Sequence, residues 1–124
     1  MNGHRLRTRK PIVTFEAFDV VVVPFPFTDK STTKRRPALV LSKAKRFNQR
    51  IGHSVLAMIT SANNSDWPLD TEINDLDAAG LPAASVVRMK LFTLDDRLII
   101  RKAGELGDND REAVTEALRL LLPF

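Results

Sequence analysis

Three consecutive cationic side chains are the first feature of the sequence that could do chemistry. Lys34, Arg35 and Arg36 end a polar stretch that begins at Thr28, and an apolar segment follows directly from Pro37. A guanidinium group binds phosphate through two parallel hydrogen bonds, and the following proline keeps Arg36 in an extended conformation. The pattern therefore predicts an anion-binding rim, suited to a phosphate chain, where a loop enters a strand.

Two hydroxyl side chains, Thr60 and Ser61, end an apolar segment that is typical of a strand. Side chains at a strand end can face a groove, but hydroxyls there also commonly cap local backbone groups. The chain has no cysteine and two histidines, so it offers no thiol nucleophile and no dedicated zinc site. Catalysis would therefore depend on arginines, hydroxyls and carboxylates, with no metal and no cofactor.

Charge is distributed unevenly along the chain, whose formal net charge is +4. Residues 1–14 carry four basic groups and no acid, and residues 30–65 carry eight basic groups, Lys43 among them, and no acid. Residues 66–124 carry twelve acids and seven bases. This segregation predicts a basic face that binds an anion and an acidic flank, although any single lysine could be an ordinary solvated charge.

Short apolar segments separated by turn-forming residues predict a mainly β fold of the α+β class. A short helical turn is expected between Asn74 and Gly80, and Asp108 is expected to cap a final helix. An apolar stripe follows on that helix, made of Val114, Ala117, Leu118, Leu121 and Leu122. The predicted strands are residues 19–25, 37–42, 54–60, 85–92 and 97–101, with a weaker edge strand at 69–73. These elements predict a small closed or half-closed sheet with an amphipathic C-terminal helix packed across it.

The length of 124 residues fits one domain with a single core. No window approaches the roughly 18 consecutive apolar residues that a membrane span needs, and basic residues interrupt the N-terminus where a signal peptide would be apolar. We therefore expect a cytoplasmic protein with no membrane partner. A basic extension, ordered or disordered, is expected at residues 1–14, ahead of a domain at residues 15–124.

Six sequence blocks occur in a specific order: 19–29 (DVVVVPFPFTD), 35–42 (RRPALVLS), 57–61 (AMITS), 79–88 (AGLP, then SVVR), 92–95 (FTLD) and 103–106 (AGEL). In this order they resemble the MazF/PemK family of toxins from bacterial type II toxin-antitoxin pairs, over roughly residues 18–122. The resemblance implies an SH3-like small barrel (CcdB/MazF/PemK-like), a homodimer and metal-independent cleavage of single-stranded RNA. It also implies a cognate antitoxin as partner, together with which such toxins bind DNA.

The resemblance also implies roles for individual residues. Arg36 matches the family's catalytic arginine at a strand entry, and Thr60 matches a hydroxyl residue that stabilises the reacting phosphate. Arg88 matches an arginine used in acid or base catalysis by some members, which carry an aspartate two residues later where this chain has Lys90. The general base would then be a hydroxyl, a water or Asp95. Contacts to RNA are expected from Lys34, Arg35, Lys43, Ser61 and Lys90.

Cleavage of RNA without a metal uses the 2'-hydroxyl as an internal nucleophile and yields a 2',3'-cyclic phosphate and a 5'-hydroxyl. Two other functions stay open. Lys90 in place of a carboxylate fits a noncatalytic member that binds RNA or the antitoxin. A gyrase-directed toxin would need an exposed aromatic anchor near the C-terminus, where Phe124 is the candidate. Trp67 could stack on a base or cover the end of the barrel, and the acidic cluster around Asp70 is interpreted as a solvated edge.

Overall fold

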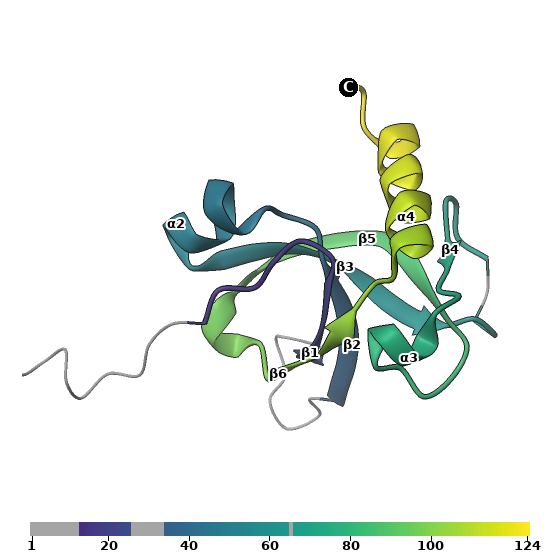
Figure 1. The fold of residues 1–124 in the computed structure, drawn as a ribbon, viewed down its shortest axis with the longest axis horizontal. Helices are drawn as coiled ribbons and strands as arrows, with labels where there is room; N and C mark the ends of the chain where they lie inside the picture. Colours follow the sequence, from purple (N-terminus) through teal and green to yellow (C-terminus); the bar gives the residue numbers. More distant parts are fainter. Residues whose placement is uncertain (1–12, 26–33, 65) are drawn as a thin grey trace, which may run out of the picture.

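A computed structural model describes residues 13–25, 34–64 and 66–124 of the chain. Within them, six strands form one curled antiparallel sheet, and helix α4 (Asp108–Leu121) stands at one side of it (Figure 1). Along the sheet the order is β4 (Thr71–Glu72), β5 (Ser85–Asp95), β3 (His53–Ser61), β2 (Lys34–Val40), β1 (Asp19–Phe25) and β6 (Arg101–Glu105). The predicted mainly β fold with a C-terminal helix is confirmed. Most of the expected basic extension and the loop at residues 26–33 lie outside the described residues.

Both faces of β1 pack against a core cluster, which explains the almost uninterrupted apolar run of this strand. Val20 lies opposite Leu39 and faces a core cluster that includes residues of α4, while Val21 lies opposite Ala38 and faces a second cluster. Successive side chains of a strand point to opposite faces, so a one-residue shift in register would exchange the two clusters. The register of β1 and β2 is therefore strongly specified by packing.

The helices around the sheet differ partly from expectation. The short helix α3 (Leu76–Ala79) ends at Gly80 as predicted, where φ is 72° and a Cβ would lie 2.1 Å from the carbonyl oxygen of Ala103. The prediction that Asp108 caps the last helix is wrong, because the cap is Gly107, whose carbonyl accepts the N–H of Arg111. Asp108 lies in the first turn, where its negative charge still favours the helix dipole.

Two local segments were predicted incorrectly. Residues 97–100 do not form a strand, and β6 begins only at Arg101: η3 (Asp96–Leu98) is a 3₁₀ turn, because the Asp95 carboxylate accepts the backbone N–H of Arg97 at 2.9 Å and turns the chain. A π-helical turn, η2 (Ala44–Asn48), followed by α2 (Gln49–Ile51), was not expected after β2. Its buried Asn48 donates to the carbonyl oxygen of Ser42 and to that of Phe15, 33 residues earlier in the chain. The contact with Phe15 is long-range, and no local pattern indicates it.

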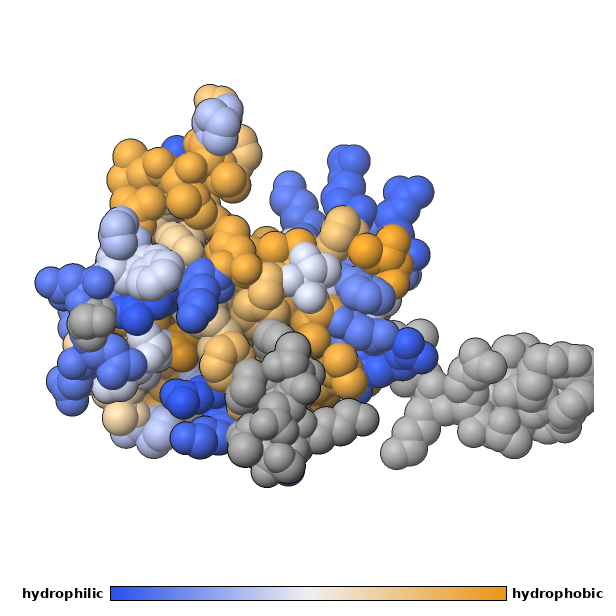
Figure 2. Space-filling view, turned by 180° about the vertical axis from the view of Figure 1, so that it is seen from behind, coloured by the Kyte–Doolittle hydropathy of each residue, from blue (hydrophilic) through white to orange (hydrophobic). Residues whose placement is uncertain are grey.

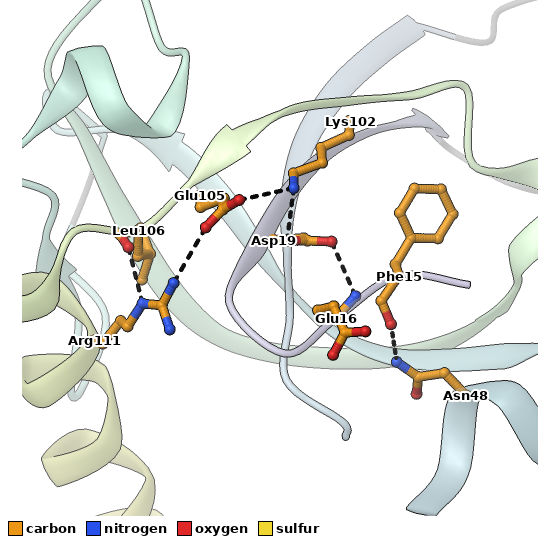
Figure 3. A network of polar contacts seen from close by, with 8 residues as sticks. All are labelled: Phe15, Glu16, Asp19, Asn48, Lys102, Glu105, Leu106 and Arg111. Carbon is orange, nitrogen blue, oxygen red and sulfur yellow. Dashed lines mark hydrogen bonds and ion pairs between the residues drawn. The ribbon is translucent and has the colours of Figure 1, made fainter. Parts of the chain in front are cut away.

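A polar network ties β1, β6 and α4 together (Figure 3). Buried Asp19 accepts the N–H of Glu16 at 2.9 Å and lies 3.3 Å from the Nζ of Lys102. Lys102 also donates to Glu105 at 2.9 Å, and this hydrogen bond raises the pKa of Lys102 and lowers that of Glu105. Glu105 in turn accepts from Arg111 of α4 at 3.3 Å. The network fixes the start of β1 against the end of β6.

The C-terminal end of α4 carries an exposed apolar surface. The predicted stripe is buried at Val114 and Ala117 but exposed at Leu121 and Leu122, and the neighbouring Leu120, 66% exposed, and Phe124 add to the apolar surface. Figure 2 shows apolar side chains gathered at this end of the molecule. The sequence stripe is therefore core in its first half and surface in its second. No helix among the described residues is long and apolar enough to cross a membrane.

Candidate functional site

Neighbouring strands bring Arg36 and Thr60 to one cavity. Ala38 of β2 pairs with Met58 of β3, and two residues further along the same strands lie Arg36 and Thr60. Because side chains alternate, both project from the same face of the sheet as that pair. They line a cavity of about 150 Å³, together with Phe25, Met58, Ile59, Arg88 and Lys90.

Strand β5 supplies the other two cations of this cavity. Arg88 pairs with Met58, while Leu91 pairs with the preceding Ala57, so the register of β3 and β5 shifts at this point. Irregularities of this kind re-aim side chains and are frequent beside functional sites. Arg88 and Lys90, two residues apart, both reach the cavity, whereas Met89 between them is buried in the core. Three of the predicted cations therefore meet at one place.

Arg88 is held by a carboxylate that the sequence interpretation assigned to a solvated edge. Its Nε donates to Oδ1 of Asp70 at 3.2 Å and its Nη2 donates to Oδ2 at 2.8 Å. The two side chains are only 12% and 19% exposed, so the solvated-edge interpretation of Asp70 is wrong. The hydrogen bonds that Arg88 donates to Asp70 raise the pKa of Arg88 above its ordinary value, which keeps the guanidinium charged.

A tight turn presents Asp70 to Arg88, and Trp67 begins the same turn. The N–H of Asp70 donates to the carbonyl of Trp67 at 3.1 Å, with Pro68 second in the turn and Leu69 third, at φ 67°. Proline followed by a residue of positive φ is the pattern of a type II turn. The Trp67 ring centroid lies 5.3 Å from Cζ of Arg88, so both ends of the turn contact one guanidinium.

The hydroxyl of Thr60 is hydrogen-bonded to a nearby side chain. Its Oγ1 accepts a hydrogen bond from Nδ2 of Asn64, a residue that sequence reasoning did not single out. Ser61 is exposed at the end of β3, where its Oγ accepts the N–H of Asn63 at 3.2 Å, and it is not part of the cavity lining. The capping role considered for these hydroxyls thus applies to Ser61, while Thr60 faces the cavity.

The remaining predicted RNA-binding residues are spread more widely than expected. Lys34 and Arg35 are exposed at the start of β2, and Arg35 lines a second hollow of about 250 Å³ that also includes Arg101. Lys43 follows the opposite end of β2. From Arg36 to the last residue of β2 the strand alone spans about 13 Å at about 3.3 Å per residue. Lys43 is therefore remote from the cavity, and its assignment to the same site is not supported.

Asp95, one candidate general base, lies at the end of β5 that is remote from the cavity. It pairs with His53, and its carboxylate accepts from Nη2 of Arg97 at 2.7 Å. The hydrogen bonds from Arg97 lower the pKa of Asp95. Asp95 is not among the residues that line the cavity, whereas Asp70 reaches its edge through Arg88. Sequence reasoning placed Asp70 only in an acidic cluster, because Leu69 is not the glycine or asparagine that would indicate a positive φ in this turn.

The polar side chains that line the cavity favour the binding of an anion. Its polar side chains are Arg36, Arg88, Lys90 and Thr60, and no carboxylate lines it among the residues that the structure describes. In the same described ranges, no group of three or more His, Cys, Asp or Glu residues is arranged to hold a metal ion. Guanidinium, ammonium and hydroxyl groups together can bind a phosphate and stabilise added negative charge on it.

Comparison with known proteins gives similar sequences and folds. The family model described as "PemK-like, MazF-like toxin of type II toxin-antitoxin system" matches residues 16–122. The chain is 24% identical to MazF from Deinococcus radiodurans, with a TM-score of 0.69 over 90% of this chain and 99% of that one. A mycobacterial endoribonuclease solved in complex with its cognate antitoxin is 18% identical, with a TM-score of 0.67 over 90% and 97% of the two chains. A MazE–MazF complex from D. radiodurans is also similar, at 24% identity and a TM-score of 0.68 over 90% and 98%. No curated protein sequence matches significantly.

Proposed function

Because the chain belongs to the PemK-like, MazF-like family of toxins from type II toxin-antitoxin systems, we propose that it is a metal-independent endoribonuclease acting on single-stranded RNA in the cytoplasm. The observation that carries the proposal is the meeting of Arg36, Thr60 and Arg88 in one small cavity. A scissile phosphodiester bound there would contact two guanidinium groups and a hydroxyl at once.

The reaction is an attack of the 2'-oxygen on the adjacent phosphorus, with departure of the 5'-oxygen. Arg36 binds the non-bridging oxygens and stabilises the charge that grows on them in the phosphorane. Thr60 donates its hydroxyl hydrogen to the same phosphate, and Arg88, fixed and charged by Asp70, adds a second guanidinium. With no carboxylate lining the described part of the cavity, water accepts the proton of the 2'-hydroxyl and a water molecule protonates the departing 5'-oxygen. Catalysis then rests mainly on electrostatic stabilisation, and turnover is slow.

The direct test is incubation of the purified protein with mixed-sequence RNA in EDTA. Discrete fragments with 2',3'-cyclic phosphate and 5'-hydroxyl ends are the expected products. Intact RNA after prolonged incubation contradicts the proposal. A control with Arg36→Ala and Thr60→Ala variants excludes a contaminating ribonuclease, because cleavage by the contaminant would be unchanged.

A noncatalytic RNA- or antitoxin-binding protein is the second candidate. The observation that favours it is Lys90 at a cavity without a lining carboxylate in the described ranges. This function predicts that labelled RNA or an antitoxin binds while the RNA stays intact at every pH tested. Fragments that appear with the wild type and are lost with Arg36→Ala exclude it.

We propose that the chain forms a homodimer and binds an antitoxin encoded beside it. The exposed leucines at the end of α4 support an apolar interface, and related structures include toxins solved with their antitoxins. Co-expression with the adjacent small reading frame should yield a complex that no longer cleaves RNA. A complex that keeps full activity would contradict inhibition by that partner.

A further inference from the structure

The size of the cavity limits what it can hold. At about 150 Å³ it is well below the 300–1,000 Å³ of typical small-molecule sites, so it suits a phosphate group rather than a complete nucleotide. Under the proposed function, the bases on either side of the scissile phosphate must therefore lie outside it. Single-stranded nucleic acid is usually held outside such a site by stacking on aromatic side chains.

Trp67 is the aromatic side chain placed to do this. Two described aromatic residues are exposed, Trp67 at 40% and Phe124 at 92%, and Trp67 contacts the cavity's own cations. Its ring centroid lies 5.3 Å from Cζ of Arg88 and 6.0 Å from Nζ of Lys90. Trp67 belongs to neither core cluster, so covering the interior of the sheet does not explain its position.

The indole is also held in place before any ligand arrives. Trp67 starts the tight turn that ends at Asp70, and Pro68 restricts the backbone of the tryptophan to extended conformations. Asp70 anchors Arg88, which lies over the ring. Leu69 accepts a positive φ within this turn, a conformation that costs free energy and persists only where packing enforces it. A fixed aromatic surface loses little entropy when a base stacks on it.

From this arrangement we propose that Trp67 forms a nucleobase-binding site beside the phosphate cavity, where a base next to the scissile phosphate stacks on the indole. The site deepens the proposed ribonuclease function and rests on it. Stacking selects for the presence of a base more than for its identity, since every base offers a π-face. Trp67 therefore contributes affinity and positions the strand, while sequence preference arises elsewhere.

The chain offers a direct probe of this site, because Trp67 is its only tryptophan and it has no tyrosine. Intrinsic fluorescence thus reports on Trp67 alone. Wild-type protein is titrated with a mixed-sequence 2'-O-methyl oligoribonucleotide, which lacks the attacking hydroxyl, with an abasic oligomer of equal length and with inorganic polyphosphate. Binding is followed independently by displacement of a labelled oligonucleotide. The expected result is strong quenching by the base-containing oligomer and little quenching by the other two at equal occupancy.

Variants supply a second measurement. Trp67→Leu should weaken binding of the base-containing oligomer about 5- to 100-fold, Trp67→Phe should weaken it less, and the abasic oligomer should show no difference between variants. Phe124→Leu removes the other exposed aromatic side chain and should leave affinity unchanged. If Trp67→Leu lowered affinity for both oligomers equally, the ring would act only by supporting Arg88, and the proposal would be overturned.

The remaining outcomes separate this inference from the function on which it rests. Equal quenching by polyphosphate, or tight RNA binding with unchanged fluorescence, overturns the stacking site while the ribonuclease proposal stands. No binding of any oligonucleotide overturns both. RNA cleavage that is identical in wild type and Trp67→Leu on short oligonucleotides also contradicts a stacking role next to the scissile bond.

Discussion

Arg88 and Asp70 are joined by two hydrogen bonds, Nε to Oδ1 at 3.2 Å and Nη2 to Oδ2 at 2.8 Å, although 18 residues separate them in the chain. A carboxylate that grips both donors of one edge of a guanidinium fixes its plane as well as its position. The pair therefore determines how Arg88 enters the cavity, and it is one of the contacts by which the β3–β4 connection reaches the candidate site.

Asp70→Ala should lower kcat for RNA cleavage about 10- to 100-fold, because a guanidinium displaced by about an ångström no longer matches the transition state. Asp70→Asn keeps one acceptor and should have an intermediate effect. Asp66→Asn is the matched control, since Asp66 also acts on Arg88 through its charge. If the Asp66 and Asp70 variants lost equal activity, charge alone and not geometry would be responsible.

Arg36→Ala should reduce kcat about 100- to 1,000-fold, the usual consequence of removing one preorganised donor from a developing negative charge. Arg36→Lys keeps the charge but loses the bidentate fork, so it should restore only part of the activity. Arg50→Ala removes an exposed arginine of α2 outside the cavity lining and serves as control. Single-turnover cleavage measures all three. Activity of Arg36→Ala within a few-fold of wild type would exclude a catalytic role.

Asp110→Ala should lower the free energy of unfolding by about 2–4 kcal/mol, because two backbone N–H groups lose a charged acceptor. The buried carboxylate of Asp110 accepts from the N–H of Asn74 at 3.0 Å and from the N–H of Asp75 at 2.9 Å. These bonds join α4 to the segment between β4 and α3. Urea denaturation tests the effect, and Glu112→Ala, at an exposed site in the same helix, should change stability little.

Asp96→Asn should stabilise the fold at neutral pH. Burial raises the pKa of Asp96 above its ordinary value of 3.8, although Ser54 donates to it at 2.6 Å. Because the pKa of Asp96 is higher in the folded state than in the unfolded state, ionisation of Asp96 lowers the free energy of unfolding as the pH rises. Below the unfolded-state pKa the carboxyl is protonated in both states, and this loss of stability is absent. The advantage of the variant in urea unfolding should therefore shrink toward about pH 4. A pH-independent difference would show that the charge of Asp96 is not the cause.

Leu120→Asp should reduce self-association if the exposed end of α4 is a subunit interface, because it places a charge on an apolar surface. Sedimentation velocity measures the shift from dimer to monomer. Leu98→Asp is the matched control, since Leu98 is 52% exposed in η3. A dimer that persists in the Leu120 variant would place the interface elsewhere.

The sequence was sufficient to predict the positions of most strands. The apolar runs located β1, β3 and the start of β5, since strands buried on both faces need continuous apolar residues. It also indicated Arg36 and Thr60, because each stands at the end of such a run. The edges of elements were less predictable: β2 begins three residues before the predicted start at Pro37. The early start is compatible with the proline because β3 pairs with β2 only from Ala38 onward.

What the sequence alone determined is most of the strands, β6 excepted, and the residue types at their ends, because side-chain periodicity and turn chemistry act over a few residues. Tertiary structure decided which of those residues meet. Register between β3 and β5 placed Arg88 and Lys90 beside Thr60, and kept Asp95 at the opposite end of its strand. Packing of Leu69 against the core accompanies the positive φ that brings Asp70 to Arg88. Such pairings depend on contacts between segments far apart in the chain, which local patterns do not encode.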